Sequence, residues 1–220
     1  AGYEASWVGK NKKGNSESRF AVAASSSDLN RATKERKMVF FMEHGAGQVY
    51  NVRNNSYAGG PGRDNVCLFL SPGPHVTKAN KAWYPTTPSV NVGVPKLDHW
   101  HRTMRPEIDS KKSTPVVCIS FHWDCHVCPE TRSGFDHFQQ AVIDAKAAEQ
   151  SARREDGSPM EFKLIGHSHP RIRSMVKPFF EELNIPFYDE FEDVLEEADV
   201  YVCDNSSTIF EFASIGKPVV

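Results

Sequence analysis

Hydrophobic and polar positions form short blocks along most of the chain. Apolar runs end in turns rich in glycine, proline or polar residues, and several turns lead into stretches whose apolar residues recur at helical spacing. Bounded apolar runs of this kind predict buried strands, and helical spacing predicts helices with one buried face. The expected strands occupy residues 20–24, 38–42, 66–70, 89–94, 116–121, 162–165, 185–188 and 200–203, with a further strand starting at 219–220.

The expected helices lie between these strands. Phe138, Val142 and Ala145 recur at helical spacing, and the later stretches between strands show the same pattern. Strands that alternate with helices predict an α/β fold with parallel sheets covered on both faces. A polar, irregular stretch at 96–114 indicates a linker, so we expect two α/β units. The expected helices are 135–153, 171–183, 191–198 and 206–215, with one more ending near Trp83, and the expected units are 1–110 and 111–220.

The composition is that of an ordinary globular protein. Of the 220 residues, 39% are hydrophobic and 25% are charged. The formal net charge is -2, so we expect no nucleic-acid partner. No apolar run approaches the ~20 residues needed to cross a bilayer, and the first residues lack a signal-peptide pattern. The five cysteines are few and odd in number, which favours reduced thiols in the cytoplasm.

Polar residues follow three of the expected strands, and in open α/β sheets ligands bind at the carboxyl ends of strands. The first of these residues is His44, which lies between Glu43 and Gly45 after the strand 38–42. Imidazole titrates near neutral pH, so a histidine in this position suits proton transfer. The alternative is a loop histidine with a structural hydrogen bond.

The second loop, Gly166–Arg171, contains His167, His169 and Arg171 where a helix is expected to begin. The free N–H groups and the dipole of a helix N-terminus favour anions, and the arginine adds positive charge. The loop therefore predicts an anion site, with a simple helix cap as the alternative.

The third loop follows the strand 200–203 and carries hydroxyl groups on Ser206, Ser207 and Thr208. Hydroxyls and free amides at a helix start predict a phosphate cradle. Glu211 lies one helical turn further and could accept hydrogen bonds from the hydroxyls of a ribose. A serine or threonine followed three residues later by glutamate is also the signature of a capping box, which is the alternative here.

A fourth cluster offers metal-ligand chemistry. His122, Cys125, His126 and Cys128 lie within seven residues, and zinc uses such ligands. The spacing is cramped, and the other three cysteines fall inside expected strands. A polar loop is the preferred interpretation, zinc at His122, Cys125 and Cys128 is the open alternative, and we expect no metal and no cofactor.

Taken in order from about His44 to Val220, these loops resemble the CDP-glycerol glycerophosphotransferase family. That family builds teichoic-acid-type polymers and shares the two-domain GT-B architecture of many glycosyltransferases. The most specific match is the last one, with Ala-Asp, Asp-x-Ser-Ser, Phe-Glu and Lys-Pro in the family's order. The matching segments are His44-Gly45, Gly93–Asp98, His169–Arg171, Ala198–Val200, Asp204–Ser207, Phe210-Glu211 and Lys217-Pro218.

The resemblance implies a GT-B-like fold of two Rossmann-like domains facing a cleft, both incomplete in this chain. Residues 1–110 would be the acceptor-side domain, and 111–220 would be the donor-binding domain, truncated at its C-terminus. His44 would be the general base that deprotonates an acceptor hydroxyl, and His169 the second catalytic residue. The donor diphosphate would be held by His169, Arg171, Ser206, Ser207 and Thr208.

The resemblance also implies a CDP-linked donor such as CDP-glycerol and a polymer, lipid or glycan acceptor. A membrane-bound acceptor would place the enzyme in the cytoplasm at the inner face of the membrane, in peripheral association with it. A metal ion is unnecessary when helix amides and cations stabilise the leaving group.

Three departures from the family pattern leave the donor open. Asn205 stands where the family has tyrosine, and Glu211 stands where it has aspartate. Ser120–Trp123 replaces the family's Pro-Thr-Trp-Arg. The alternatives are a GT-B glycosyltransferase that uses a nucleotide sugar, a UDP-N-acetylglucosamine 2-epimerase-like enzyme, and a non-catalytic module that binds a nucleotide or a glycan.

Overall fold

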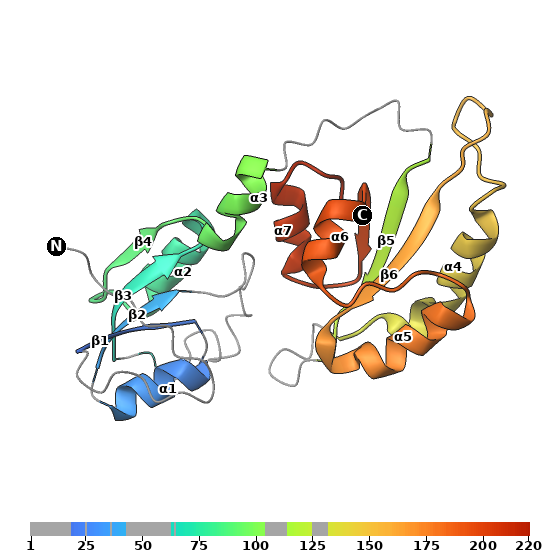
Figure 1. The fold of residues 1–220 in the computed structure, drawn as a ribbon. Coiled ribbons are helices and arrows are strands. Elements are labelled where there is room, and N and C mark those ends of the chain that lie inside the picture. The colour runs from blue at the N-terminus through green and yellow to red at the C-terminus, as the bar shows by residue number, and fades with distance from the viewer. Residues whose placement is uncertain are drawn as a thin grey trace. The chain divides into compact units, whose positions relative to one another are not determined.

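The structure is a computed structural model, and it describes residues 19–24, 26–35, 37–42, 63, 65–103, 114–124 and 132–220. The described residues fall into two compact units, one up to Gly93 and one from Val94 to Val220. The expected boundary near residue 110 lies outside the described residues. Each unit combines one parallel sheet with helices (Figure 1), which confirms the expected α/β class.

The first unit has a four-stranded parallel sheet in the order β1-β2-β3-β4. Val39 and Phe41 alternate inward from β2 and form a core with Phe69 of β3. One helix in this unit was not expected, because its sequence is polar, but Leu29 and Ala32 give it a buried face. The elements are β1 (Phe20–Ala23), α1 (Ser26–Lys34), β2 (Met38–Met42), β3 (Val66–Ser71), α2 (Pro74–Trp83) and β4 (Ser89–Asn91).

The second unit has a parallel sheet in the order β6-β5-β7. Single parallel bridges extend it at both edges, from Gly166 to Phe187 and from Tyr201 to Val219. The expected strands 185–188 and 219–220 are therefore present only as bridges. The strand order reverses between β5 and β7, as in doubly wound nucleotide-binding folds. The strands are β5 (Val116–Phe121), β6 (Lys163–Ser168) and β7 (Val200–Cys203).

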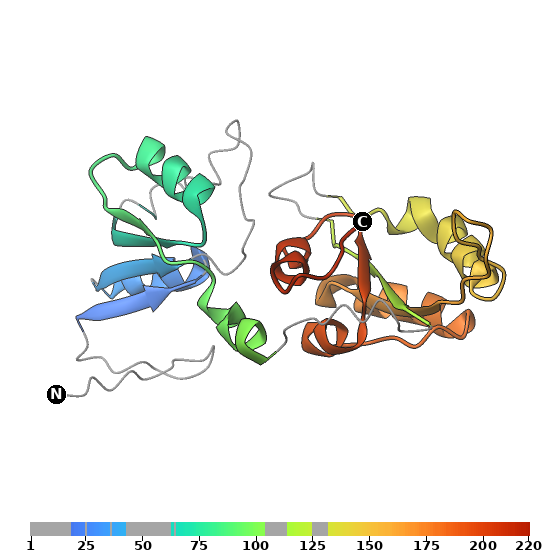
Figure 2. The same cartoon turned by 90° about the horizontal axis from the view of Figure 1, so that it is seen from above.

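Helices cover both faces of this sheet, as Figures 1 and 2 show. Side chains of a strand point alternately to opposite faces. Cys118 of β5 therefore packs in the core beneath α6 and α7, and Phe121 packs in the core beneath α4 and α5. Gly166 is required where β6 passes Phe180, because a Cβ there would lie 2.5 Å from the ring. The helices are α4 (Phe135–Ala148), α5 (Arg173–Glu182), α6 (Phe191–Glu197) and α7 (Thr208–Ser214).

A short helical segment precedes this sheet in the second unit, where the sequence predicted an irregular linker. It consists of η2 (Pro95–Leu97) and α3 (Asp98–Thr103). Leu97 is buried, and Trp100 packs against the core beneath α6 and α7. No helix among the described residues is long and apolar enough to cross a membrane.

Two residues of the family-like signature have structural roles. Lys217 Nζ donates hydrogen bonds to the carbonyl oxygens of Leu195 at 2.6 Å and Ala198 at 2.7 Å, at the C-terminus of α6. A cation there satisfies carbonyls that lack helical partners. Asp199 Oδ2 accepts the backbone N–H of Val116 at 2.7 Å and so aligns the starts of β7 and β5. Lys217 and Asp199 therefore stabilise the fold of the second unit.

Candidate functional site

The Asp204 carboxylate ties together two strand ends at the carboxyl edge of the second sheet. Its Oδ1 accepts the backbone N–H of His122, just after β5, at 2.9 Å. Its Oδ2 accepts the N–H of Gly134, the N-cap of α4, at 2.7 Å. The strand order reverses between β5 and β7, and a doubly wound sheet opens a ligand crevice at such a point. Asp204 therefore fixes the loops on the two sides of that point.

His169 lies after β6 and caps the short turn η3 (Pro170–Ile172). Its Nδ1 accepts the backbone N–H of Arg171 at 3.2 Å, which places the proton of a neutral imidazole on Nε2. Burial, followed by the charges of His122 and Arg171, lowers the pKa of His169 to about 4. At neutral pH the ring is therefore uncharged and can donate a hydrogen bond through Nε2. The cap and a ligand would thus use different nitrogens.

Trp123, just after β5, is the centre of an aromatic cluster. Its ring centroid lies 5.5 Å from that of His169, and Arg171 Cζ lies 3.9 Å from the centroid of the same indole ring. The rings of His122 and His169 meet edge to face at 5.4 Å. A guanidinium over an aromatic face gains cation–π attraction and keeps its N–H donors for a ligand. Among the described residues, no carboxylate forms an ion pair with Arg171, so its charge is available to an anion.

The prediction of the site missed this contribution from the loop after β5. The sequence pattern places His122 in a polar loop with zinc as the alternative, and Trp123 enters only within the segment that departs from the family pattern. The signal was present, because both residues directly follow an expected strand, as the other site residues do.

Ser206, Ser207 and Thr208 form the turn into α7, but their polar groups differ in their partners. Thr208 Oγ1 lies 2.8 Å from the buried Tyr201 hydroxyl, and the Thr208 N–H donates to Ser206 Oγ at 3.3 Å. Ser207 is the N-cap of α7 and makes no side-chain cap hydrogen bond. Within the described part of the chain, we find no hydrogen bond to the Ser207 hydroxyl, so it is open to a ligand.

Glu211 of α7 is buried, with 5% of its surface exposed, and its Oε1 lies 2.5 Å from Lys96 Nζ of η2. The carboxylate pairs with this lysine rather than with a backbone N–H at the start of α7, so the capping box is not formed. Ser206 provides the side-chain acceptor for that turn instead.

His167 lies within β6 and not in the loop where the sequence placed it, because the strand continues to Ser168. Its side chain is buried, and its Nδ1 lies 2.8 Å from Ser120 Oγ. Burial, followed by the charges of Arg173 and His169, lowers its pKa to about 4. His167 is therefore a neutral core residue beneath the site.

Several predicted residues lie outside the described part of the chain. These are His44 in the first loop and Cys125, His126 and Cys128 in the metal alternative. The described residues contain no group of three or more histidine, cysteine, aspartate or glutamate side chains placed to hold a metal ion.

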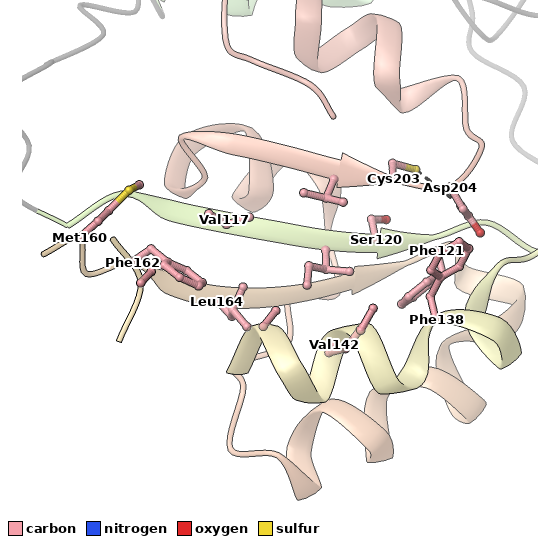
Figure 3. A pocket seen from close by; sticks show the side chains of 15 residues that line it. Val117, Ser120, Phe121, Phe138, Val142, Met160, Phe162, Leu164, Cys203 and Asp204 are labelled. Carbon is pink, nitrogen blue, oxygen red and sulfur yellow. Dashed lines mark hydrogen bonds between the residues drawn. The ribbon is translucent and has the colours of Figure 1, made fainter. Parts of the chain in front are cut away.

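A cavity of about 550 Å³ lies between α4 and the sheet. Figure 3 shows that its lining is almost entirely apolar, with Val117, Leu164 and Val142 along its length and Asp204 at one end. The diphosphate group of a nucleotide donor needs charged or hydrogen-bonding partners. This cavity therefore does not suit a diphosphate, in contrast to the loops beside it.

No family model and no curated protein matches this sequence. Solved structures do match it in fold. One is a variant of the wall teichoic acid polymerase TagF soaked with CDPG, with a TM-score of 0.55 and 11% identity over 91% of this chain and 52% of that one. A putative UDP-N-acetylglucosamine 2-epimerase from Listeria monocytogenes has a TM-score of 0.57 and 14% identity over 91% and 55% of the two chains.

A UDP-N-acetylglucosamine 2-epimerase from Rickettsia bellii matches with a TM-score of 0.54 and 16% identity, over 91% of this chain and 54% of that one. The chain therefore spans about half the length of the structures it matches. Identities this low show the fold and not the reaction, and the two kinds of enzyme share the GT-B-like architecture. The chain thus has a GT-B-like α/β fold.

Proposed function

We propose that this protein is a transferase that moves glycerol phosphate from a CDP-linked donor to an acceptor hydroxyl. The observation that carries the proposal is the arrangement at the carboxyl end of β6. There, His169 presents Nε2–H and Arg171 carries a charge without a described carboxylate partner, beside the loop after β5. Together they suit an anionic ligand at the carboxyl edge of the sheet, the edge at which doubly wound sheets bind nucleotides.

In this proposal, Arg171, His169 and Ser207 contact the phosphates of the donor. Arg171 offers paired N–H donors, and His169 donates one hydrogen bond while remaining neutral. Ser206 and Thr208 shape the turn that presents the Ser207 hydroxyl. Glu211 accepts a hydrogen bond from the ribose.

The reaction is a phosphoryl transfer. The acceptor oxygen forms a bond to the phosphorus of the glycerol phosphate, and the bond from that phosphorus to the CMP oxygen breaks. The proton of the acceptor hydroxyl goes to His44, the proposed general base. CMP departs with the electron pair, and Arg171 and His169 stabilise the negative charge that it gains. The acceptor is a polymer, lipid or glycan at the inner face of the membrane.

A nucleotide-sugar donor is the second candidate. Glu211 in place of the family's aspartate supports it, because GT-B enzymes that grip the ribose of a nucleotide sugar use glutamate at such a position. Sugar transfer would use the same phosphate contacts but would break the bond at the anomeric carbon. In that case a nucleoside diphosphate would leave.

A thermal-shift screen separates these candidates. Its ligands are CDP-glycerol, CDP, CMP, UDP, UDP-glucose and UDP-N-acetylglucosamine. A ligand at about 100 times its dissociation constant stabilises the folded state by ~2.7 kcal/mol. We expect a shift with the cytidine ligands, whereas a shift with the uridine ligands alone would support the sugar donor. No shift with any of them would contradict both candidates.

Variants then assign the shift to the site. Ser207→Ala and Arg171→Met should lose most of the CDP shift, whereas Ser151→Ala and Arg153→Met, in the exposed turn after α4, should keep it. His44→Ala should abolish turnover and leave the shift intact. If the wild-type protein binds CDP-glycerol but shows no turnover with any acceptor, the protein is a non-catalytic binding module and the proposed transferase activity is wrong.

A further inference from the structure

The buried carboxylate of Glu211 has one charged partner among the described residues, and that partner comes from a distant part of the sequence. Lys96 Nζ lies 2.5 Å from Glu211 Oε1. The lysine side chain is 50% exposed, whereas the glutamate side chain is 7% exposed. The pair therefore lies at the border of the core, with the carboxylate inside and the cation reaching in from solvent.

A buried carboxylate needs such a partner. Burying a charge is unfavourable unless the charge is paired, and an unpaired acid would lose its charge instead. An ionised carboxylate accepts hydrogen bonds through both oxygens, whereas a protonated one gives up part of that capacity. Lys96 uses Oε1, and we find no hydrogen bond to Oε2 among the described residues.

The position of Lys96 is fixed by its neighbours. Leu97 is 4% exposed, and its N–H donates to the carbonyl of Val94 at 2.9 Å. Trp100, on the following helix, packs in the same core as Phe212, the residue after Glu211. The packing of Trp100 in this core thus anchors the segment from η2 to α3. It holds Lys96 within reach of the Glu211 carboxylate.

We propose that Lys96 is a positioning residue for ribose recognition. It fixes the carboxylate of Glu211 through Oε1, which leaves Oε2 to accept a hydrogen bond from a ribose hydroxyl of a nucleotide ligand. This inference rests on the proposed function, because it assumes that a nucleotide binds at α7. It makes the segment from η2 to α3 part of the nucleotide site, although no residue of that segment touches the ligand.

The test compares a ribonucleotide with its deoxy counterpart. Calorimetry gives the dissociation constants of CDP and 2′-deoxy-CDP for the full chain and its variants. The wild type should prefer CDP by about 10-fold or more, as expected for a hydrogen bond to a charged group. Lys96→Met should reduce this preference to about 3-fold or less, because the carboxylate loses the contact that fixes it, and Glu211→Gln should do the same, because it removes the carboxylate. Lys96→Arg should keep the preference.

A control and a second variant keep the result interpretable. Lys163→Met changes an exposed lysine at the start of β6 and should leave the preference at the wild-type value. If Lys96→Met does not fold, Lys96→Gln is read in its place, because it retains a hydrogen-bond donor without the charge. A purely structural role for Lys96 would change stability and the affinity for both nucleotides equally, and would leave their ratio unchanged.

Two outcomes overturn the inference in different ways. If the wild type binds neither CDP nor UDP, the proposed function fails and this inference fails with it. If the wild type binds CDP with a ribose preference that Lys96→Met retains, the proposed function stands and the role of Lys96 is wrong. A wild type that binds both nucleotides equally also rejects the inference.

Discussion

Two histidines of the same strand end show how the surroundings of a residue decide its role. His169 has one nitrogen bonded to the backbone, and we find no hydrogen bond to the other nitrogen among the described residues. His167, two residues earlier, lies inside β6 and bonds Ser120. Burial lowers the pKa of each ring to about 4. Both are therefore neutral at neutral pH, but only His169 lies in the loop that we propose to bind the donor.

The buried histidine predicts how stability changes with pH. The folded-state pKa of His167 is about 4, below its ordinary value of 6.5. As the pH falls from 6.5 towards 4, His167 takes up a proton in the unfolded state before it does so in the folded state, so the free energy of unfolding decreases on acidification. Between about pH 7 and about pH 5 this loss amounts to roughly 2 kcal/mol.

His167→Asn should remove most of that pH dependence, because the asparagine amide can still meet Ser120 but does not titrate. Urea unfolding at the two pH values measures the effect. His137→Asn, at an exposed position of α4, should behave like the wild type. Equal acid losses in His167→Asn and the wild type would show that other groups carry the dependence.

At the scale of secondary-structure elements, the Asp204 carboxylate connects the loop after β7 to the loop after β5 and to the start of α4. It accepts N–H groups from the loop after β5, from its own loop and from the start of α4. Asp204→Ala would leave these donors without their acceptor, and hydrogen bonds to charged groups contribute about 1.5–3 kcal/mol. We expect a loss of roughly 3 kcal/mol of unfolding free energy in urea.

Amide hydrogen exchange should locate this loss. Exchange should accelerate at His122 and Gly134, because their N–H groups lose the carboxylate. Asp136→Ala, in the exposed first turn of the same helix, is the matched control and should change neither stability nor exchange at these amides appreciably. Slow exchange at both amides in Asp204→Ala would show that the loops do not depend on this carboxylate.

The elements show which parts of the fold the sequence could predict. The strands 116–121 and 200–203 agree residue for residue with β5 and β7, because each is a short apolar run with clear ends. Helix α4 ends at Ala148 rather than at 153, because residues 149–162 fold back through a bridge between Arg153 and Pro159. Local patterns predict local elements, but they do not report contacts that stop an element early.

The site shows the same limit. The positions of His169 and Arg171 after a strand followed from the order of elements. The pairing of Lys96 with Glu211 did not, because it joins residues far apart in the sequence and depends on where Trp100 packs. An ion pair between residues far apart in the sequence can be identified only from the tertiary structure, whereas polar residues at strand ends can be recognised from the sequence alone.

For the whole molecule, the division into two units predicts separate stability. Each unit has its own apolar cores, and the described residues that we assign to the nucleotide all lie in the second. A fragment of residues 94–220 should therefore fold alone, with a cooperative thermal transition by circular dichroism. It should bind CDP with the affinity of the full chain, and it should lack turnover because His44 is absent.

A shorter fragment, 104–220, separates the sheet from the segment that anchors Lys96. It lacks Trp100, so the core beneath α6 and α7 loses an apolar contact, and it lacks Lys96, so Glu211 loses its cation. We expect a lower melting temperature than for 94–220 and a lost preference for ribose over deoxyribose. If the two fragments melt together and keep the same preference, the η2–α3 segment is only a connection. If 94–220 does not fold, the second unit depends on the rest of the chain.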